Sequence, residues 1–382
     1  MNKKIILILA SALIPSLSIS SVSAASYYGV SCSSENAPRN FFQYLRFIRT
    51  CSPADTNTDP EVGCEIESTP SDFFAFHQNS LWRTKIATNP EIDPNSNLMF
   101  ETLIGALDTL NQPATLSVNY KGWTTPIHFI DSEQCNKFDI STSGSGLHES
   151  VDPDENGTAE DIPIPNGVWH DPERDGHMVL VDHQKRIAWE FSKFRKIREG
   201  EYSTSTLSEW DLNGNGHLEP FSGNNWWRAG STGAGISLIG GVVTYAEFKQ
   251  GRIEHALGIA TPINRGVTSA SSSAGRELCR PAARTDAPES NIGVQYFLEG
   301  SRLQLNPDLD LDSLGLTSDT KIIARALQEY GAYVWDNGPS FSIRAQNLNP
   351  DGQQWERSVD LNLEKIPLSE FRALACDIET RL

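Results

Sequence analysis

The stretch HMVLVDHQKRIAWEFSKF, His177 to Phe194, decides the fold class of this chain. It holds two short runs rich in β-branched and aromatic residues, HMVLVDH and RIAWEFSKF, on either side of the polar pair at 184–185. Runs of this length and composition are typical of β-strands, and the pair predicts a hairpin. Successive side chains of a strand point to opposite faces, so we expect His177 and Asp182 to face different sides.

Short runs of the same kind recur along the chain between turn-forming residues. This pattern is typical of a β-sandwich or jelly roll, so we predict a mainly β fold. The runs are ATLSVNY (114–120), TPIHFI (125–130), GVVTYAEF (241–248), HALGIATPI (255–263), VQYFLEG (294–300) and RLQLN (302–306). The polar segments 141–161 and 266–276 are rich in Gly and Ser and are predicted to be loops.

Three segments show the apolar spacing of helices: 38–50, 97–112 and 318–331. In the last of them, Ser318 is the candidate N-cap and Gly331 the candidate C-cap. This late helix is expected to interrupt the series of strands.

The N-terminus has the three parts of a secretory signal peptide over residues 1–25: a basic start, an apolar run from Ile5 to Leu17, and small residues up to Ala25. We therefore predict a secreted protein, extracellular or periplasmic. No other segment approaches about 18 consecutive apolar residues, so we expect no membrane span. The remainder, 26–382, is expected to be a single β-rich domain with a helical N-terminal portion over 26–112.

The chain carries 49 acidic and 31 basic side chains, which give a net charge of −18 at pH 7. Such a surface repels the phosphates of nucleic acids and anionic membranes, so we exclude both as partners. It also disfavours a strongly anionic polysaccharide, unless a basic cleft is present. The 6 cysteines of an exported chain predict disulfides, and local pairing among Cys32, Cys51 and Cys64 is one arrangement that the sequence allows.

The densest polar cluster lies in the opening hairpin, where His177, Asp182 and Glu190 accompany Trp189. Carboxylates act as acid and base in glycosidic cleavage, and a tryptophan stacks on a sugar face. We take the first three as candidate catalytic residues and Trp189 as a candidate substrate-binding residue. The alternative is a strand end that carries solvated charges.

A second cluster lies in GRIEHALGIATP, 251–262. His255 is a candidate catalytic imidazole, and Arg252 is a candidate for binding a substrate carboxylate. The alternative for His255 is a core histidine whose ring is satisfied by a backbone partner.

A third cluster lies in YVWDNGPSFSIRAQ, 333–346. Asp336 is a candidate catalytic carboxyl group, and Trp335 and Asn337 are candidate substrate-binding residues. The alternative is a plain turn, because Asn-Gly is a strong hairpin signal.

The segment EWDLNGNGHLEP, 209–220, begins like a calcium-binding EF-hand loop, with Asp211, Asn213 and Asn215 at alternate positions. Position twelve is Ser222 instead of the required Glu, and no helical pattern flanks the segment, so it is not an EF-hand. Its oxygen spacing suits a structural Ca²⁺, and an Asx-rich turn is the alternative. We expect no cofactor to be required.

Five stretches together resemble a largely uncharacterised group of secreted bacterial and fungal proteins. They are NSLWRTKI (79–86), DPNSNLMFETL (93–103), IPIPNGVWHDPERDGHMVLVD (162–182), GRIEHALGIATP (251–262) and IARALQEYGAYVWDNG (323–338). The last two are the more specific motifs, and the stretches span most of the chain. Members often look like carbohydrate-handling proteins, so the resemblance implies a polysaccharide-related role. Arg83 stands where members usually have Asn.

The sequence therefore leads to two hypotheses. The first is a secreted polysaccharide-cleaving enzyme, with hydrolysis favoured over elimination because the chain is acidic. It predicts that Glu190→Gln abolishes hydrolysis without loss of folding. The second is a non-catalytic carbohydrate-binding or cell-surface protein. In both, the expected partner is a polysaccharide or cell-wall glycan, and the protein is expected to be a monomer.

Overall fold

The computed structural model describes residues 26–27, 30–31, 63–218, 230–266, 276–349, 355 and 359–381. The chain divides into two units, Met1–Glu61 and Val62–Leu382. In the first unit, the described residues form the antiparallel pair β1 (Ser26–Tyr27) and β2 (Val30–Ser31). The signal peptide predicted over 1–25 and the helix predicted over 38–50 lie outside the described residues.

The second unit is mainly β, which confirms the predicted fold class. In chain order, its described helices and strands run from α2 to the C-terminal strand β18. They are α2 (Ser96–Thr109), β3 (Ser117–Asn119), β4 (Thr125–Phe129), β5 (Asn136–Leu147), β6 (Thr158–Ile164), β7 (Met178–Asp182), β8 (Ile187–Ser192), β9 (Arg195–Arg198), β10 (Glu201–Asp211), α3 (Leu238–Gly241), α4 (Tyr245–Gln250), β11 (Leu257–Thr261), β12 (Arg276–Cys279), β13 (Arg302–Leu305), α5 (Ser318–Glu329), β14 (Ala332–Asn337), β15 (Ser342–Arg344), β16 (Gln346–Asn347), the 3₁₀ helix η3 (Leu368–Glu370), β17 (Phe371–Ala373) and β18 (Ile378–Arg381).

The first large sheet contains the predicted hairpin. Its strand order is β16-β4-β7-β8-β10-β5-β6, and β9 pairs with β10. Strands β7 and β8 are antiparallel, with Val179 opposite Glu190. Met178 and Leu180 pack into one core cluster, whereas Val179 and Val181 pack into another. The run MVLV is apolar throughout because both faces of the sheet are covered.

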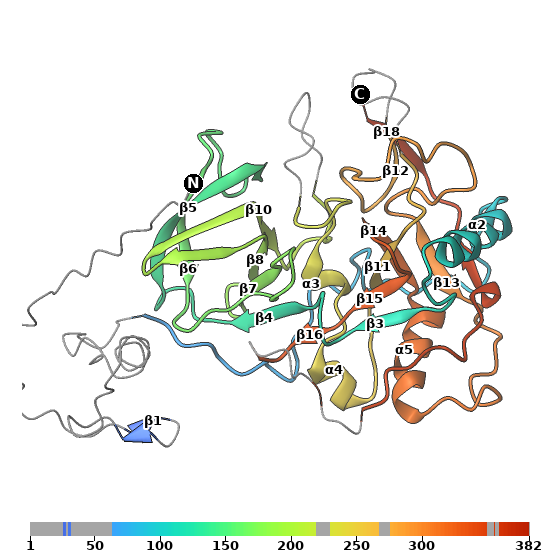
Figure 1. The fold of residues 1–382 in the computed structure, drawn as a ribbon, viewed down its shortest axis with the longest axis horizontal. Coiled ribbons are helices and arrows are strands. Elements are labelled where there is room, and N and C mark those ends of the chain that lie inside the picture. Colours follow the sequence, from blue (N-terminus) through green and yellow to red (C-terminus); the bar gives the residue numbers. More distant parts are fainter. Residues whose placement is uncertain are drawn as a thin grey trace, which may run out of the picture. The chain divides into compact units, whose positions relative to one another are not determined.

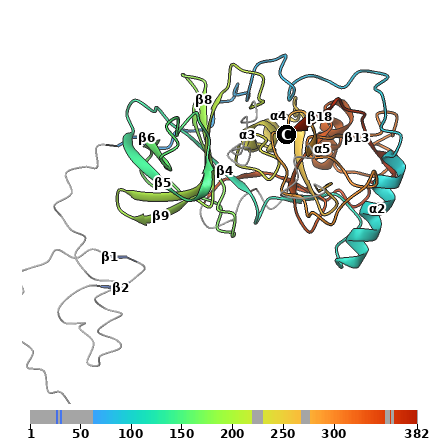
Figure 2. The ribbon, with the colours of Figure 1, turned by 90° about the horizontal axis from the view of Figure 1, so that it is seen from above.

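The second large sheet has the strand order β17-β13-β14-β11-β15-β3. It mixes parallel and antiparallel pairs: β11 is parallel to β14 and antiparallel to β15. Leu103 and Leu107 of α2 and Ile323 and Leu327 of α5 share a core cluster with the strands of this sheet. Figures 1 and 2 show α2 beyond the second sheet, on the side away from the first sheet. Strands β12 and β18 form a separate antiparallel pair.

A shared core joins the two large sheets. Val181 from β7 and Trp335 from β14 belong to the same buried cluster, and helix α3 contacts both β8 and β11. The chain also passes between the sheets four times, from β3 to β4, from β10 to β11, from β15 to β16 and from β16 to β17. β3 is parallel to β15 in the second sheet, and β4 is parallel to β16 in the first. The result is two sheets packed on a common core, as in a β-sandwich.

The segment GVVTYAEF (241–248) was predicted to be a strand, and this prediction is wrong. Helix α3 ends at Gly241, and helix α4 begins at Tyr245. The Thr244 hydroxyl accepts a hydrogen bond from Glu247 N, while the Glu247 carboxylate accepts one from Thr244 N. This reciprocal capping box starts a helix and outweighs the β-branched composition of the segment.

Two other predictions along the chain need correction. The loop predicted over 141–161 is shorter, because β5 continues to Leu147 and β6 begins at Thr158. The run VQYFLEG (294–300) contributes only a single bridge, from Phe297 to Asn264. The loop predicted over 266–276 lies mostly outside the described residues.

The helices predicted over 97–112 and 318–331 are confirmed as α2 and α5, with small shifts of their ends. The N-cap of α5 is Thr317, not Ser318, because the Thr317 hydroxyl accepts a hydrogen bond from Thr320 N. Gly331 lies just beyond the helix with a φ of 69°, a left-handed conformation that suits glycine. Between 63 and 95, where a helical portion was expected, the chain forms turns and loops.

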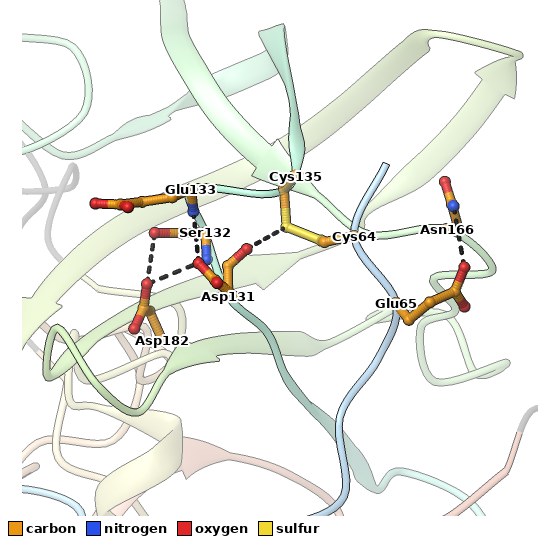
Figure 3. Close-up of a disulfide and its surroundings, with 8 residues drawn as sticks. All are labelled: Cys64, Glu65, Asp131, Ser132, Glu133, Cys135, Asn166 and Asp182. Atoms are coloured by element: carbon orange, nitrogen blue, oxygen red, sulfur yellow. Dashed lines mark hydrogen bonds between the residues drawn. A yellow bond between two sulfur atoms is a disulfide. The ribbon is translucent and has the colours of Figure 1, made fainter. Parts of the chain in front are cut away.

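Two disulfides lie in the second unit, Cys64–Cys135 and Cys279–Cys376. They confirm the prediction that the chain forms disulfides. The local pairing suggested for Cys64 is wrong, because Cys64 is bonded to Cys135 at the start of β5 (Figure 3). Cys32 and Cys51 lie outside the described residues.

Candidate functional site

A polar pocket of about 500 Å³ lies where the first sheet meets the end of β14. The segments 231–233 and 284–286 complete its wall. The charged or imidazole side chains that line it are Asp175, His177, Lys193, Arg284, Asp286 and Asp336, and Ser192, Ser205, Thr206, Ser231, Thr232, Thr285 and Asn337 add hydroxyl and amide groups. Its volume is that of a small-molecule site, but its lining is more polar than is usual for such sites. The pocket unites three residues singled out in the sequence: His177, Asp336 and Asn337.

His177 precedes β7 and is a neutral imidazole. Its Nδ1 lies 3.4 Å from the carbonyl oxygen of Phe191, a contact that assigns the proton to Nδ1 and leaves a lone pair on Nε2. Burial lowers the pKa of His177 well below its usual value, and the positive charge of Arg344 acts in the same direction. At neutral pH this ring can therefore accept a hydrogen bond through Nε2 but resists protonation.

Asp336, near the end of β14, is held by two donors. Its Oδ2 accepts a hydrogen bond from Arg344 Nη2 at 2.6 Å, and its Oδ1 accepts one from Gly233 N at 3.3 Å. Burial raises the pKa of Asp336 to about 6; Arg344 opposes this shift, and the neighbouring carboxylates of Asp286 and Asp175 add to it. Asp336 is therefore a carboxyl group that takes up a proton under mildly acidic conditions.

Asp286 lies close to Asp336, with the backbone of Gly233 between them. A methyl group added at Gly233 would approach both carboxylate oxygens of Asp286 to 2.5 Å, while Gly233 N lies 3.3 Å from Asp336 Oδ1. The two distances, added to the span from the nitrogen of Gly233 to the position of that methyl group, give an upper limit of about 8 Å between oxygens of the two carboxyl groups. A side chain at position 233 would displace Asp286, so glycine is needed for this close approach.

Arg284 holds the same loop in place. Its Nε donates to the carbonyl of Gly233 at 3.1 Å, and its Nη2 donates to that of Thr232 at 2.7 Å. The backbone of the 284–286 segment is anchored as well, because Ala283 N and Arg284 N both donate to the carbonyl of Ala234. Much of the hydrogen-bonding capacity of Arg284 is thus used within the protein.

Glu190 lies outside the pocket, at the N-terminus of α3. Its carboxylate accepts hydrogen bonds from the Ser237 hydroxyl at 2.7 Å and from Leu238 N and Ile239 N, each at 2.9 Å. Burial raises the pKa of Glu190 to about 7, although these hydrogen bonds oppose the shift. The structure therefore places Glu190 as a link between β8 and α3, completely enclosed by protein.

Asp182 also lies outside the pocket, at the end of β7. Its Oδ2 accepts hydrogen bonds from Ser132 N at 3.1 Å and from the Ser132 hydroxyl at 2.5 Å, and its Oδ1 accepts one from Lys185 N at 2.8 Å. Figure 3 shows it beside Ser132, near the disulfide Cys64–Cys135. Burial alone would raise the pKa of Asp182, but these donors lower it. Such contacts stabilise the turn between β7 and β8.

His255 belongs to a different, small cavity. Its Nε2 lies 3.1 Å from a carboxylate oxygen of Glu247, and its Nδ1 lies 2.8 Å from the carbonyl oxygen of Ala256. Burial alone would lower the pKa of His255, but the Glu247 carboxylate raises it. Arg252 lies elsewhere, with a side chain that is 63 % exposed and 3.4 Å from Glu254. The structure does not bring His255 or Arg252 to the polar pocket.

The two candidate tryptophans are also separate from this pocket. Trp335 is fully buried in the core shared by the sheets, with the Arg344 guanidinium 5.7 Å from its ring centre. Trp189 lines a second cavity of about 510 Å³ on the first sheet, together with Glu209, Lys137 and Asp161. Burial raises the pKa of Glu209, although a hydrogen bond from Trp189 opposes the shift.

The loop that begins at Asp211 uses its oxygens within the protein. Asp211 Oδ1 accepts from Asn213 N at 2.8 Å, and Asn215 Oδ1 accepts from Leu81 N at 3.0 Å. The carbonyl oxygen of Gly216 accepts from Trp82 Nε1 at 3.0 Å. This arrangement supports the Asx-turn interpretation, in which the loop holds the segment around residue 82.

Several pocket residues were not found from the sequence. The sequence did not single out Asp175, Lys193, Arg284 or Asp286. Arg284 and Asp286 lie in the segment RTDAP (284–288), whose charged residues next to prolines were the only available signal.

Within the described part of the chain, no three His, Cys, Asp or Glu side chains are grouped so that they could hold a metal ion. The helices of that part are all too short or too polar to cross a bilayer. Comparisons of the chain with protein-family models, with curated proteins and with solved structures found no match.

Proposed function

We propose that this protein is a secreted glycoside hydrolase whose active site is the polar pocket. The observation that carries the proposal is the pair Asp286 and Asp336, two carboxyl groups within about 8 Å on one pocket wall. Glycosidases use such pairs at separations of about 5 to 9.5 Å, one as the acid and the other as the base or nucleophile. The two disulfides support secretion, because disulfides persist in oxidising compartments.

The environments of the two carboxyl groups suggest their roles. Asp336, whose pKa is raised to about 6, is suited to be the general acid. It would protonate the bridging oxygen while the bond from that oxygen to the anomeric carbon breaks and its electron pair stays on the oxygen. Asp286 would take the proton of the water that attacks the anomeric carbon, or would attack that carbon itself.

The remaining lining suits a neutral sugar. Hydroxyl and amide side chains surround the carboxyl groups and suit sugar hydroxyls, although Ser192 and Thr206 are bonded to each other and Ser231 and Thr232 donate to backbone carbonyls. A polysaccharide lyase would need a cation to neutralise a uronate carboxylate; Arg284 is already bonded to two backbone carbonyls, which leaves Lys193 against the three aspartates of the pocket. The aspartates of the pocket would also repel a uronate. We therefore favour hydrolysis over elimination.

The experiment is a digestion screen of the purified protein on neutral and uronate-containing polysaccharides. Hydrolysis releases reducing ends without the ultraviolet absorbance of unsaturated sugars. We expect Asp336→Asn and Asp286→Asn each to lower kcat by about 10²- to 10⁴-fold. Glu209→Gln in the second cavity is the matched control and should keep its activity. Full activity of Asp336→Asn, with circular dichroism like that of the parent, would overturn the assignment.

A second candidate function is carbohydrate binding without cleavage. It is favoured by the cavity at Trp189, because an indole flanked by carboxylates and hydroxyls suits a sugar ring. In that case the screen would show no products, and calorimetric titration would detect binding that Glu209→Gln weakens and Asp336→Asn does not.

A further inference from the structure

Glu299 is a fully buried carboxyl group directly behind the pocket. Its Oε1 accepts a hydrogen bond from Asn264 Nδ2 at 2.9 Å, and the same amide nitrogen donates to the backbone carbonyl of Asp336. Its Oε2 is enclosed and accepts no hydrogen bond of good geometry from the described residues, although the Thr285 side chain lies near enough to Glu299 to oppose the rise of its pKa. A buried carboxylate oxygen without a donor destabilises the ionised form of the group.

The groups that face Glu299 suggest how this cost is avoided. They are the Asp286 carboxyl group, the Thr285 side chain and, at longer range, the Arg284 guanidinium. Burial raises the pKa of Glu299 well above its usual value, and the negative charge of Asp286 raises it further. Two carboxylates cannot hydrogen-bond to each other when both are ionised, because each only accepts. A proton on one of them turns the contact into a donor–acceptor pair.

We propose that Glu299 is a positioning residue that keeps its proton at neutral pH and donates a hydrogen bond from Oε2 to the carboxylate of Asp286. Glu299 is the member of the pair that is more deeply enclosed, whereas Asp286 borders the pocket. The proton therefore resides on the inner group, and Asp286 faces the pocket as the acceptor of the hydrogen bond. Hydrogen bonds from Glu299 behind and close packing on Gly233 beside it would fix the orientation of Asp286.

The consequence for catalysis rests on the proposed function of Asp286. A carboxylate that must act as base or nucleophile gains from a neutral donor, because the donor orients it without supplying a competing positive charge. Glutamine at position 299 can reproduce both contacts, with its oxygen toward Asn264 and its amide group toward Asp286. Methionine has a similar length but offers no donor.

The protonation of Glu299 is tested first, without substrate. Carboxyl carbons of glutamate labelled with carbon-13 are followed by NMR over a pH titration, and Glu299 is identified by the signal that Glu299→Gln removes. We expect this signal to keep the chemical shift of a protonated acid up to at least pH 7. A transition below pH 7 would overturn the proposal, whether or not a substrate is known.

The positioning role is tested next on the glycan found in the digestion screen. We expect Glu299→Gln to retain kcat within about 3-fold, while Glu299→Met loses about 10- to 100-fold in kcat with KM little changed, as expected for one hydrogen bond to a charged group. Equal activities of the two variants would overturn this role. If no glycan is cleaved at all, the proposed function fails, while the titration still decides where the proton lies.

Discussion

The buried carboxyl group of Glu190 should make the stability of this protein depend on pH. The pKa of Glu190 is raised from 4.5 to about 7 in the folded protein, because burial penalises its ionised form. The contribution of protonated Glu190 to the free energy of unfolding is complete below pH 4.5 and is lost as the pH rises through about 7. A shift of this size corresponds to about 3 kcal/mol between pH 4.5 and pH 8. Glu190→Gln cannot ionise and should not show this loss.

The assay is urea unfolding of the parent and of Glu190→Gln at both pH values, followed by tryptophan fluorescence. We expect the parent to lose about 3 kcal/mol more than the variant on going to pH 8. Asp182→Asn serves as a control, because the pKa of Asp182 is lowered and its contribution is not lost at alkaline pH. If the free energy of unfolding changes equally between the two pH values in the parent and in Glu190→Gln, the reasoning is refuted. The variant should also keep its hydrolytic activity, contrary to the expectation from the sequence.

Three further predictions concern stability, each measured by urea unfolding. Cys376→Ser removes a disulfide and should cost about 2–5 kcal/mol, whereas an unchanged midpoint would show that the bridge contributes little. His255→Gln breaks the buried pair with Glu247 and should cost about 3–5 kcal/mol. Because the pKa of His255 is raised, that deficit should be largest below pH 6.5 and shrink as the pH rises; a deficit independent of pH would contradict the ion pair. Gly258→Ala would place a methyl group 2.0 Å from the Trp335 ring and should destabilise the protein by about 1–3 kcal/mol or more, so normal stability would contradict the packing described.

Local composition was sufficient to predict much of the fold. The hairpin at 177–194 and the helix that became α5 follow from residue type and apolar period alone. The strand β10, by contrast, reads EYSTSTLSEWD and was overlooked, because its Ser and Thr side chains carry no apolar signal. It forms because β5 and β8 pair with it on both sides, a partnership that no short window reveals.

The site was harder to predict because its parts come from distant segments. Asp336 could be noticed beside an apolar strand, but its partners Gly233 and Arg344 are identified only by the tertiary structure. Glu190 was predicted to be catalytic because the residues that bind its carboxylate are equally distant in the sequence. The donors that occupy its carboxylate come from residues 237–239, 47 to 49 positions further along the chain.

The pairing of β3 with β15 has a consequence for biosynthesis. Ser117 in β3 is hydrogen-bonded to Phe341 next to β15, although 224 positions separate them. A ribosome must therefore deliver almost the whole chain before β3 finds its neighbour in the second sheet. Contacts of such long range slow folding, and partly made chains expose apolar surface. Translation products that stop before residue 341 should accordingly be bound by chaperones or degraded, because β3 then lacks β15 and the core of the second sheet lacks Phe341 and Ile343.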